Sequence, residues 1–552
     1  MLALLAISLV LLPYVNAQLA PAVPAAQALP LLLNAQPINT DCTGIDLNPN
    51  TPDGLCQTVF LDTLTTFYPA NDVQVLAGGA VGTAVNCAAL FQQGTASPIT
   101  GTFSFELGGT TYTVANGQLN TAQGSDTGLG VPEPGVPFDP DYTIYTFSGS
   151  LDAECGTATI VWDSTCSPNT FFVSIILRGT TDNNGNFFVN AIASQSQMNA
   201  DGSAAIVVAP IQFKATVGAV DFAGGDAASG LRRRALLHSQ TAPDAKLAAD
   251  MELWRMVREG DRDAHHFFHS NGGRHLAEES AVLMPSGRRL DDGSIITVLV
   301  LVTASAEKRV GGFEQVNARV QASIAYANMV LANSGVQTSL VASVARTAYV
   351  EKVPYFDEDN KRVSSTKQAL DDLASEPSGV PDAEELRAQY NSDVVTLWHY
   401  QEDDLGKCGY SNTLPSLGEP EKIKSYSYSS LRITCTSKIT TFAHELGHIF
   451  GLLHSRPDNY DDATQWMSYG TAYRVCGETI DGAYNTLMSD GYQDSTCKFA
   501  QCTLPVYSFV GEFRGRTAGE FNELTNIGHS NAMVAQYTYM AIANIAVDAA
   551  AV

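Results

Sequence analysis

The chain has 552 residues, of which 45% are hydrophobic and 16% are charged, with 57 acidic and 31 basic side chains. This composition can bury hydrophobic cores, which excludes wholesale disorder, and the length predicts more than one domain. A formal net charge of −26 repels phosphate backbones and anionic lipid surfaces, so we expect no nucleic-acid partner.

The N-terminus has the pattern of a signal peptide. Residues 2–15 are almost all apolar, and the small residues Val15 and Ala17 stand where a signal peptidase reads. The run is too short to span a bilayer, which needs about 20 residues. We therefore predict a secreted protein that loses residues 1–17, with a Pro/Ala-rich linker over residues 18–40. An apolar N-terminal strand is the alternative.

Short runs of β-branched and aromatic residues, separated by Gly, Asn, Asp and Pro, recur over residues 41–228. Residues 157–162 and 171–176 are two of the predicted strands. We predict an all-β N-terminal domain, and an antiparallel sandwich or barrel is its simplest packing. Residues 182–186 have the composition of a calcium loop, but their place between strands favours a turn, so the sequence does not support a structural Ca²⁺.

Residues 229–291 differ from both neighbouring blocks. They hold nine acidic and ten basic residues, whereas residues 1–228 hold 17 and two, and residues 292–552 hold 31 and 19. Adjacent arginines at residues 232–234 and 288–289 suit secretory processing proteases. We predict a processing region in which a propeptide is released near Arg288-Arg289, and a plain linker with a solvated helix is the alternative.

Ten cysteines in an exported chain predict disulfides. Five precede residue 228 and five follow residue 400. An odd number on each side allows one bridge between the two halves, or one free thiol in each.

From residue 292 the pattern changes to alternating strands and helices. Residues 295–302 predict a fully apolar strand, and a stripe of apolar residues at spacings of three and four predicts a helix over residues 313–331 that Gly335 can end. Further predicted strands cover residues 340–344 and 394–398, and further helices cover residues 366–373 and 383–390. This alternation predicts a mostly parallel sheet covered by helices over residues 292–552.

The C-terminal tail is apolar over residues 533–552, but Gln536, Asn544 and Asp548 interrupt it. We therefore predict a packed terminal helix beginning at Ser530 or Asn531, in preference to a membrane span.

The candidate metal-binding residues lie in one stretch, His444-Glu445-Leu-Gly-His448-Ile-Phe-Gly451-Leu-Leu-His454. His444 and His448 are one helical turn apart, so both imidazoles can reach one metal ion, with Glu445 beside it. Gly451 can adopt a left-handed conformation that ends the helix and returns His454 as a third ligand. Three neutral nitrogens and an open position suit catalytic zinc, whereas a structural zinc site would need a fourth Cys or His.

This stretch is similar, at every fixed position, to the HExxHxxGxxH signature of the metzincin zinc endopeptidases. The resemblance covers roughly residues 292–540 and implies the twisted α/β catalytic domain of that clan. It also implies that His444, His448 and His454 bind zinc and that Glu445 is the general base.

A methionine-containing turn beneath the metal is a further property of the clan. Met488, 34 residues after His454 and followed by two cysteines, resembles the adamalysin (reprolysin) and peptidyl-Asp metalloendopeptidase arrangement. Met467, two residues before Tyr469, resembles the shorter arrangement of astacins and serralysins and is the alternative.

Two further segments bear on the subfamily. Residues 408–410 and 428–435 resemble the edge-strand segment of adamalysin-like enzymes, to which a peptide could add as a strand. Ser455 stands where adamalysins have Asp and is matrixin-like.

We therefore predict a secreted zinc metalloendopeptidase that acts on proteins or peptides and is made as a zymogen. Two alternatives remain open. The first is a gametolysin-like protease of extracellular matrix glycoproteins, and the second is a surface-binding protein whose peptidase domain has decayed.

Overall fold

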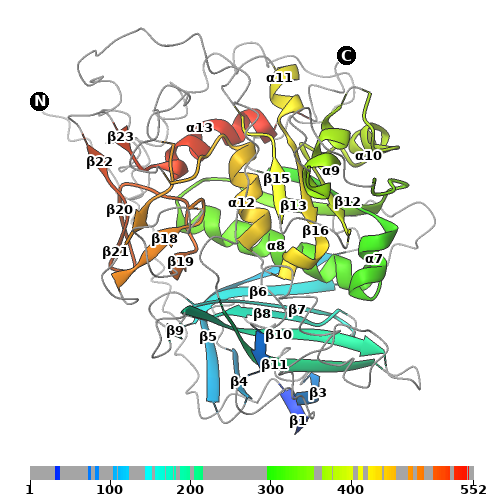
Figure 1. Cartoon of the computed structure of the whole chain (residues 1–552), viewed down its shortest axis with the longest axis vertical. Helices are drawn as coiled ribbons and strands as arrows, with labels where there is room; N and C mark the ends of the chain where they lie inside the picture. The colour runs from blue at the N-terminus through cyan, green and yellow to red at the C-terminus, as the bar shows by residue number, and fades with distance from the viewer. Residues whose placement is uncertain are drawn as a thin grey trace, which may run out of the picture.

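A computed structural model describes residues 32–37, 73–75, 81–85, 103–107, 110–123, 143–151, 156–167, 170–177, 180–181, 187–198, 204–214, 295–352, 363–375, 377–401, 408–414, 420–437, 440–455, 470–476, 482–489, 502–522, 527–543 and 545. The predicted signal peptide, the processing region over residues 229–291, the turn over residues 182–186 and Met467 lie outside the described residues. Two large sheets flank one long helix, α8 (Phe313–Asn333) (Figure 1).

The C-terminal sheet has five strands in the order β13–β12–β14–β16–β15. The bounds are β12 (Ile295–Val302), β13 (Ser339–Arg346), β14 (Val394–His399), β15 (Gly409–Ser411) and β16 (Tyr428–Arg432). The first four in spatial order pair in parallel, and β15 joins β16 antiparallel at the edge. The mostly parallel sheet predicted from the sequence is therefore confirmed.

Strand β12 is hydrophobic on both faces because helices cover both faces of the sheet. Val298 and Val300 belong to the cluster that contains α8 and α12 (Thr440–Ile449), whereas Leu299 and Leu301 belong to a second cluster. That second cluster includes residues of α9 (Ser365–Ala374) and α10 (Ala383–Tyr390).

The remaining elements of this half are shorter. They are α7 (Ala304–Val310), α11 (Pro420–Ser425), the 3-10 helix η5 (Ile433–Ser437), β17 (Arg474–Val475), β18 (Tyr484–Thr486), β19 (Cys502–Leu504), β20 (Gly511–Phe513), β21 (Arg516–Gly519), β22 (Phe521–Asn522) and β23 (Ile527–Gly528). Helix α8 continues two residues beyond its predicted end, and Gly335, with φ 75°, turns the chain after it.

The predicted terminal helix is confirmed as α13 (Asn531–Ala543), which is largely buried. Among the described helices, none combines the length and the hydropathy that crossing a bilayer requires.

The N-terminal sheet is antiparallel and has eleven strands. They are β1 (Leu32–Pro37), β2 (Val73–Val75), β3 (Val81–Val85), β4 (Phe103–Leu107), β5 (Thr110–Gln123), β6 (Thr143–Leu151), β7 (Gly156–Asp163), β8 (Phe172–Ile176), β9 (Thr180–Thr181), β10 (Phe187–Met198) and β11 (Ala204–Lys214). Strands β6, β7 and β8 pack against α8, as Figure 1 shows. The separateness of this unit as a domain stays a prediction.

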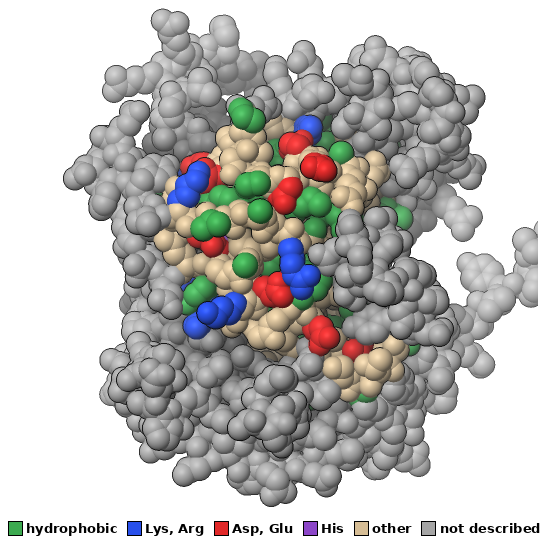
Figure 2. Space-filling view, turned by 90° about the vertical axis from the view of Figure 1, so that its right-hand side faces the viewer, with side chains coloured by type: hydrophobic (Ala, Val, Ile, Leu, Met, Phe, Trp, Pro, Cys, Tyr) green, Lys and Arg blue, Asp and Glu red, His purple; other side chains and the backbone are tan. Residues whose placement is uncertain are grey.

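On the face of the molecule in Figure 2, the acidic and basic side chains of the described residues are interspersed among hydrophobic ones. Three ion pairs of the C-terminal half are Lys352–Asp372 at 2.6 Å, Lys367–Asp371 at 2.5 Å and Lys424–Glu384 at 3.0 Å. Exposed pairs of this kind contribute little to stability, typically about 0–1 kcal/mol each.

Candidate active site

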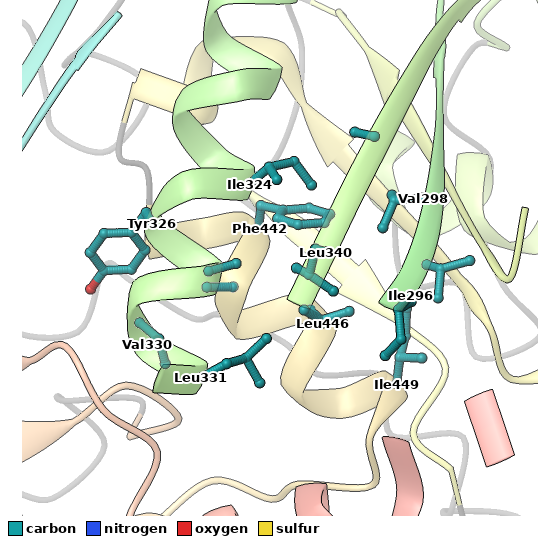
Figure 3. Packing of buried hydrophobic residues seen from close by; sticks show 14 of the residues in the cluster. Ile296, Val298, Ile324, Tyr326, Val330, Leu331, Leu340, Phe442, Leu446 and Ile449 are labelled. Carbon is teal, nitrogen blue, oxygen red and sulfur yellow. The ribbon is translucent and has the colours of Figure 1, made fainter. Parts of the chain in front are cut away.

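Helix α12 holds the predicted metal ligands because one of its faces is anchored in the core. Phe442, Leu446 and Ile449 are almost fully buried, at spacings of three and four. Figure 3 shows Phe442 against Ile324 of α8, with all three residues pointing toward the core. The amphipathic pattern therefore fixes the rotation of the helix about its axis, and so the direction of its other side chains.

Gly451 ends this helix as the sequence predicted. Its φ is 84°, in the left-handed region, and its N–H donates to His448 O at 2.7 Å. Leu452 N then donates to Gly447 O at 2.9 Å, and Leu453 forms a bridge with Thr471. The chain thus turns back at once and carries His454 to the helix.

The three histidines converge. His454 Nε2 lies 3.0 Å from His444 Nε2 and 3.1 Å from His448 Nε2. His444 Nδ1 donates to Leu487 O at 3.1 Å and His448 Nδ1 donates to Leu452 O at 2.9 Å. A neutral imidazole that donates from Nδ1 has its lone pair on Nε2, so lone pairs point at a common centre, which favours a cation there.

Glu445 lies between the two helical histidines and is fully buried. Its Oε2 accepts a hydrogen bond from Ser411 Oγ at 2.6 Å, and its Oε1 has no hydrogen-bond partner among the described residues. Burial raises the pKa of this carboxyl to about 8, and the Ser411 hydrogen bond acts in the opposite direction. A carboxylate in such a place can exchange a proton near neutral pH.

Met488 lies directly beneath α12. It is fully buried, and a methyl group added at Gly447 would clash with its sulfur. The preceding Leu487 provides the carbonyl that holds His444, and Tyr507 Oη donates to Ala443 O at 2.8 Å. Met488 is therefore placed where the predicted Met-turn belongs, and the assignment itself stays a prediction.

Ser455, which follows the third histidine, is connected to the same turn. Ser489 Oγ donates to Ser455 Oγ at 3.2 Å. A short hydroxyl pair thus joins the end of the histidine segment to the residue after Met488, at the position where the sequence departs from the adamalysin pattern.

One disulfide borders the site. Cys408 and Cys435 are bonded, and they join the start of β15 to η5, just before α12. Cys166 and Cys476 are also disulfide-bonded, so none of these four described cysteines is a free thiol.

Two residues near Glu445 were missed by the sequence analysis. Gly409 and Ser411 both face Glu445 from β15. Gly409 lies in the predicted edge segment over residues 408–410 and Ser411 directly follows it, and their spacing of two was the available signal, since alternate residues of a strand share a face.

Part of the chain is similar in sequence to metallopeptidases. Residues 292–499 match the family model Reprolysin_5, described as metallo-peptidase family M12. The chain is also similar to the peptidyl-Asp metalloendopeptidase of Pseudomonas aeruginosa, with 24% identity over 216 residues. That match covers 37% of this chain and spans 33% of the relative.

Among solved structures, the chain is similar to one titled "Structure of a chaperone-substrate complex". The identity is 16%, the TM-score is 0.32, and the match covers 46% of this chain and 39% of the other.

Proposed function

We propose, from the premise that residues 292–499 match the M12 metallopeptidase model, that this chain is a secreted zinc-dependent metalloendopeptidase. The observation that carries the proposal is the convergence of three histidine Nε2 atoms beside a buried glutamate. The proposed ligands are His444, His448 and His454.

The residues present fit a zinc ion. Among the described residues, His444, His448 and His454 form the one group of three or more metal-binding side chains, and no fourth His, Cys, Asp or Glu joins it. Three imidazoles and a free coordination position are typical of catalytic zinc, and backbone carbonyls hold two of the three here, His444 and His448. Bound Zn²⁺ would supply Lewis acidity, which polarises a peptide carbonyl and makes water a better nucleophile at neutral pH.

Glu445 is the proposed general base. It accepts the proton of the attacking water and returns it to the leaving amine of the cleaved peptide. Its burial favours the protonated form in the metal-free protein, and a nearby positive charge favours the carboxylate. A cation held by the three histidines would therefore favour the ionised form of Glu445, which can accept a proton.

The substrate is proposed to be an extended peptide that adds to the edge of the C-terminal sheet. Strand β15 pairs with β16 on one side, and no other described strand pairs with it. A strand at the edge of a sheet can bind peptides through main-chain hydrogen bonds, which suits cleavage of varied proteins. The Pseudomonas aeruginosa relative is named a peptidyl-Asp metalloendopeptidase, so aspartate is the first residue to vary in test peptides.

Secretion and zymogen processing are part of the proposal. The apolar residues 2–15 support export, and the Cys408–Cys435 disulfide supports an oxidising compartment. We propose the division into signal peptide (1–17), linker (18–40), β-rich prodomain (41–228), processing region (229–291) and peptidase domain (292–552). Residues 32–37 of the predicted linker form β1 and pair with β3, so the linker ends earlier than predicted. N-terminal sequencing of secreted active material is expected to show a chain that begins near residue 290, and active material in which every chain begins at Gln18 would refute the cleavage.

Replacement of the base tests the function. We expect Glu445→Ala to lower cleavage of a peptide library by at least about 10³-fold while zinc stays near one per chain. Glu385→Ala, the same change at an exposed position on α10, serves as the matched control. Full proteolysis by Glu445→Ala would overturn the assignment.

The two alternatives are separated by substrate and metal content. A gametolysin-like role predicts preferential cleavage of extracellular matrix glycoproteins. A decayed peptidase predicts a purified protein that holds no zinc, which the converging histidines speak against.

A further inference from the structure

Strand β15 presents alternate residues to the proposed base. Gly409 and Ser411 share one face of the strand and both contact Glu445, whereas Tyr410 between them packs in the second hydrophobic cluster on the other face. A methyl group added at Gly409 would clash with the Glu445 carboxylate. The absence of a side chain at Gly409 therefore allows Ser411 to reach Glu445.

The strand is fixed at both of its ends. At its start, the Cys408–Cys435 disulfide joins it to η5, and Arg432 N donates to Cys408 O at 2.9 Å. Just beyond its end, Leu414 N donates to His448 O at 3.2 Å, which ties the chain to α12 itself. Ser411 is thus held against the helix that carries Glu445 and is not free to move away.

We propose that Ser411 is a positioning residue for Glu445, an inference that rests on the proposed peptidase function. Its hydroxyl holds Oε2 at 2.6 Å and leaves Oε1, which is buried and has no described hydrogen-bond partner, for the attacking water. The terminal torsion of a glutamate is broad and needs an external contact to fix it. Holding a reacting group in one orientation is worth a large part of a rate enhancement.

The chain offers a matched control. Ser429 lies opposite Ser411 in the register of β15 and β16 and is equally buried, and its hydroxyl has no hydrogen-bond partner among the residues that the structure describes. Ser429→Ala therefore removes the same atom from the neighbouring strand without touching Glu445. Such a change is close to neutral for stability, because no hydrogen bond is lost.

The kinetic test compares the two serine variants as full-length enzymes. We expect Ser411→Ala to lower kcat about 10- to 100-fold, with KM within about twofold and zinc still near one per chain, because a group that only orients the base affects the chemical step. Ser429→Ala is expected to match the wild type. A kcat of Ser411→Ala within about twofold of Ser429→Ala would overturn the proposal.

A second variant covers the case in which Ser411→Ala folds poorly. Gly409→Ala pushes the Glu445 carboxylate away from Ser411, so kcat is expected to fall at least as far while zinc content is kept. Full activity of Gly409→Ala would contradict the proposed arrangement.

A crystal structure of the metal-free Ser411→Ala protein supplies a readout that does not depend on activity. The Glu445 carboxylate is expected to leave its place or occupy several rotamers, and an unchanged single position would overturn the proposal. If the wild type itself cleaves nothing, the peptidase function fails, and this structure still decides the role of Ser411.

Discussion

Two sheets pack against different sides of α8, and they differ in what they contribute. On the C-terminal side, α12 and β15 supply the histidines, Glu445 and Ser411. On the N-terminal side, Ile144, Val161 and Phe172 of β6, β7 and β8 enter the same hydrophobic cluster. Among the described residues, the N-terminal sheet contributes buried hydrophobic contacts, and the C-terminal side contributes all the residues of the proposed active site.

Contact with both sheets explains why nearly all sides of α8 are buried. Its apolar stripe faces the C-terminal sheet and α12, as Ile324 and Leu331 do in Figure 3. Its polar residues Gln315, Asn317 and Arg319 are buried as well, and the Arg319 guanidinium lies 5.3 Å from the ring centroid of Phe172. A helix buried on every side needs two partners, so the N-terminal sheet completes the core of the C-terminal half.

The largest effect is expected from the metal ligands. His448→Ala removes one of the three proposed ligands, so we expect loss of bound zinc and at least about a 10³-fold fall in cleavage. Ser148→Ala, which removes a buried hydrogen bond to Thr159 in the N-terminal sheet, is expected to leave both unchanged. Metal analysis measures the zinc content and a peptide assay measures cleavage. Zinc loss in Ser148→Ala would show that the N-terminal sheet also affects the proposed metal site.

A cut between the two halves tests whether burial alone holds them together. After limited proteolysis within residues 229–291, we expect the two pieces to elute together in gel filtration, because they share one hydrophobic cluster through α8. A non-reducing denaturing gel shows whether a disulfide also joins them. Separation into two independently folded pieces would contradict the shared core.

Paired phenylalanines compare the two sides of α8 directly. Phe442 of α12 and Phe172 of β8 are each 2% exposed and belong to the same cluster. We expect alanine at either position to lower the free energy of unfolding by about 3–5 kcal/mol. Only Phe442→Ala is expected to lower kcat in the folded enzyme, since it supports the helix of the histidines. Urea unfolding measures the loss of stability, and peptide-cleavage kinetics measure kcat. A lower kcat in Phe172→Ala would show that the N-terminal sheet also affects peptide cleavage.

The buried carboxyl gives the site its own pH signature in the metal-free protein. Burial raises the pKa of Glu445 from 4.5 to about 8, so folding favours its protonated form. This stabilisation is present below the unfolded pKa and is lost as the pH rises through about 8. As the pH rises through about 8, we expect the free energy of unfolding of Glu445→Gln to increase relative to that of the wild type, as measured by urea unfolding. Glu385→Gln on the surface is the control, and parallel curves for Glu445→Gln and wild type would argue against the buried position.

The smallest effect is expected where arginines stack on rings. Arg319 is buried over Phe172, whereas Arg346 is half exposed, 4.1 Å from the ring centroid of Phe313, and paired with Glu307. Lysine keeps the charge but loses the planar contact, so we expect Arg319→Lys to cost about 1 kcal/mol and Arg346→Lys under about 0.5 kcal/mol. Equal losses of unfolding free energy in the two variants would show that burial against the N-terminal sheet does not strengthen the contact of Arg319 with Phe172.

The elements of the C-terminal half were predictable because their patterns are local. The apolar run at residues 295–302 matches β12, and the helix over residues 383–390 matches α10. The burial of Gln315 and Arg319 was not predictable, because a polar face normally indicates solvent and its covering strands are more than 100 residues away in the sequence.

Part of the candidate site was predictable from local sequence patterns and part was not. The three histidines follow from helix periodicity and from the left-handed turn that Gly451 allows, and both are local properties. The contact of Ser411 with Glu445 joins residues 34 positions apart and depends on the register of β15 against β16, which the sequence does not specify. Between the two methionines, Met488 lies under the helix, and Met467 is outside the described residues.

Metal removal and return is the most direct test of the central claim that the three histidines hold a zinc ion needed for peptide cleavage. The wild type is stripped with a chelator and titrated with Zn²⁺ while peptide cleavage is followed. We predict no cleavage by the metal-free protein and full recovery at one zinc per chain. Cleavage by the zinc-free protein, or inactivity with one zinc bound, would contradict the account.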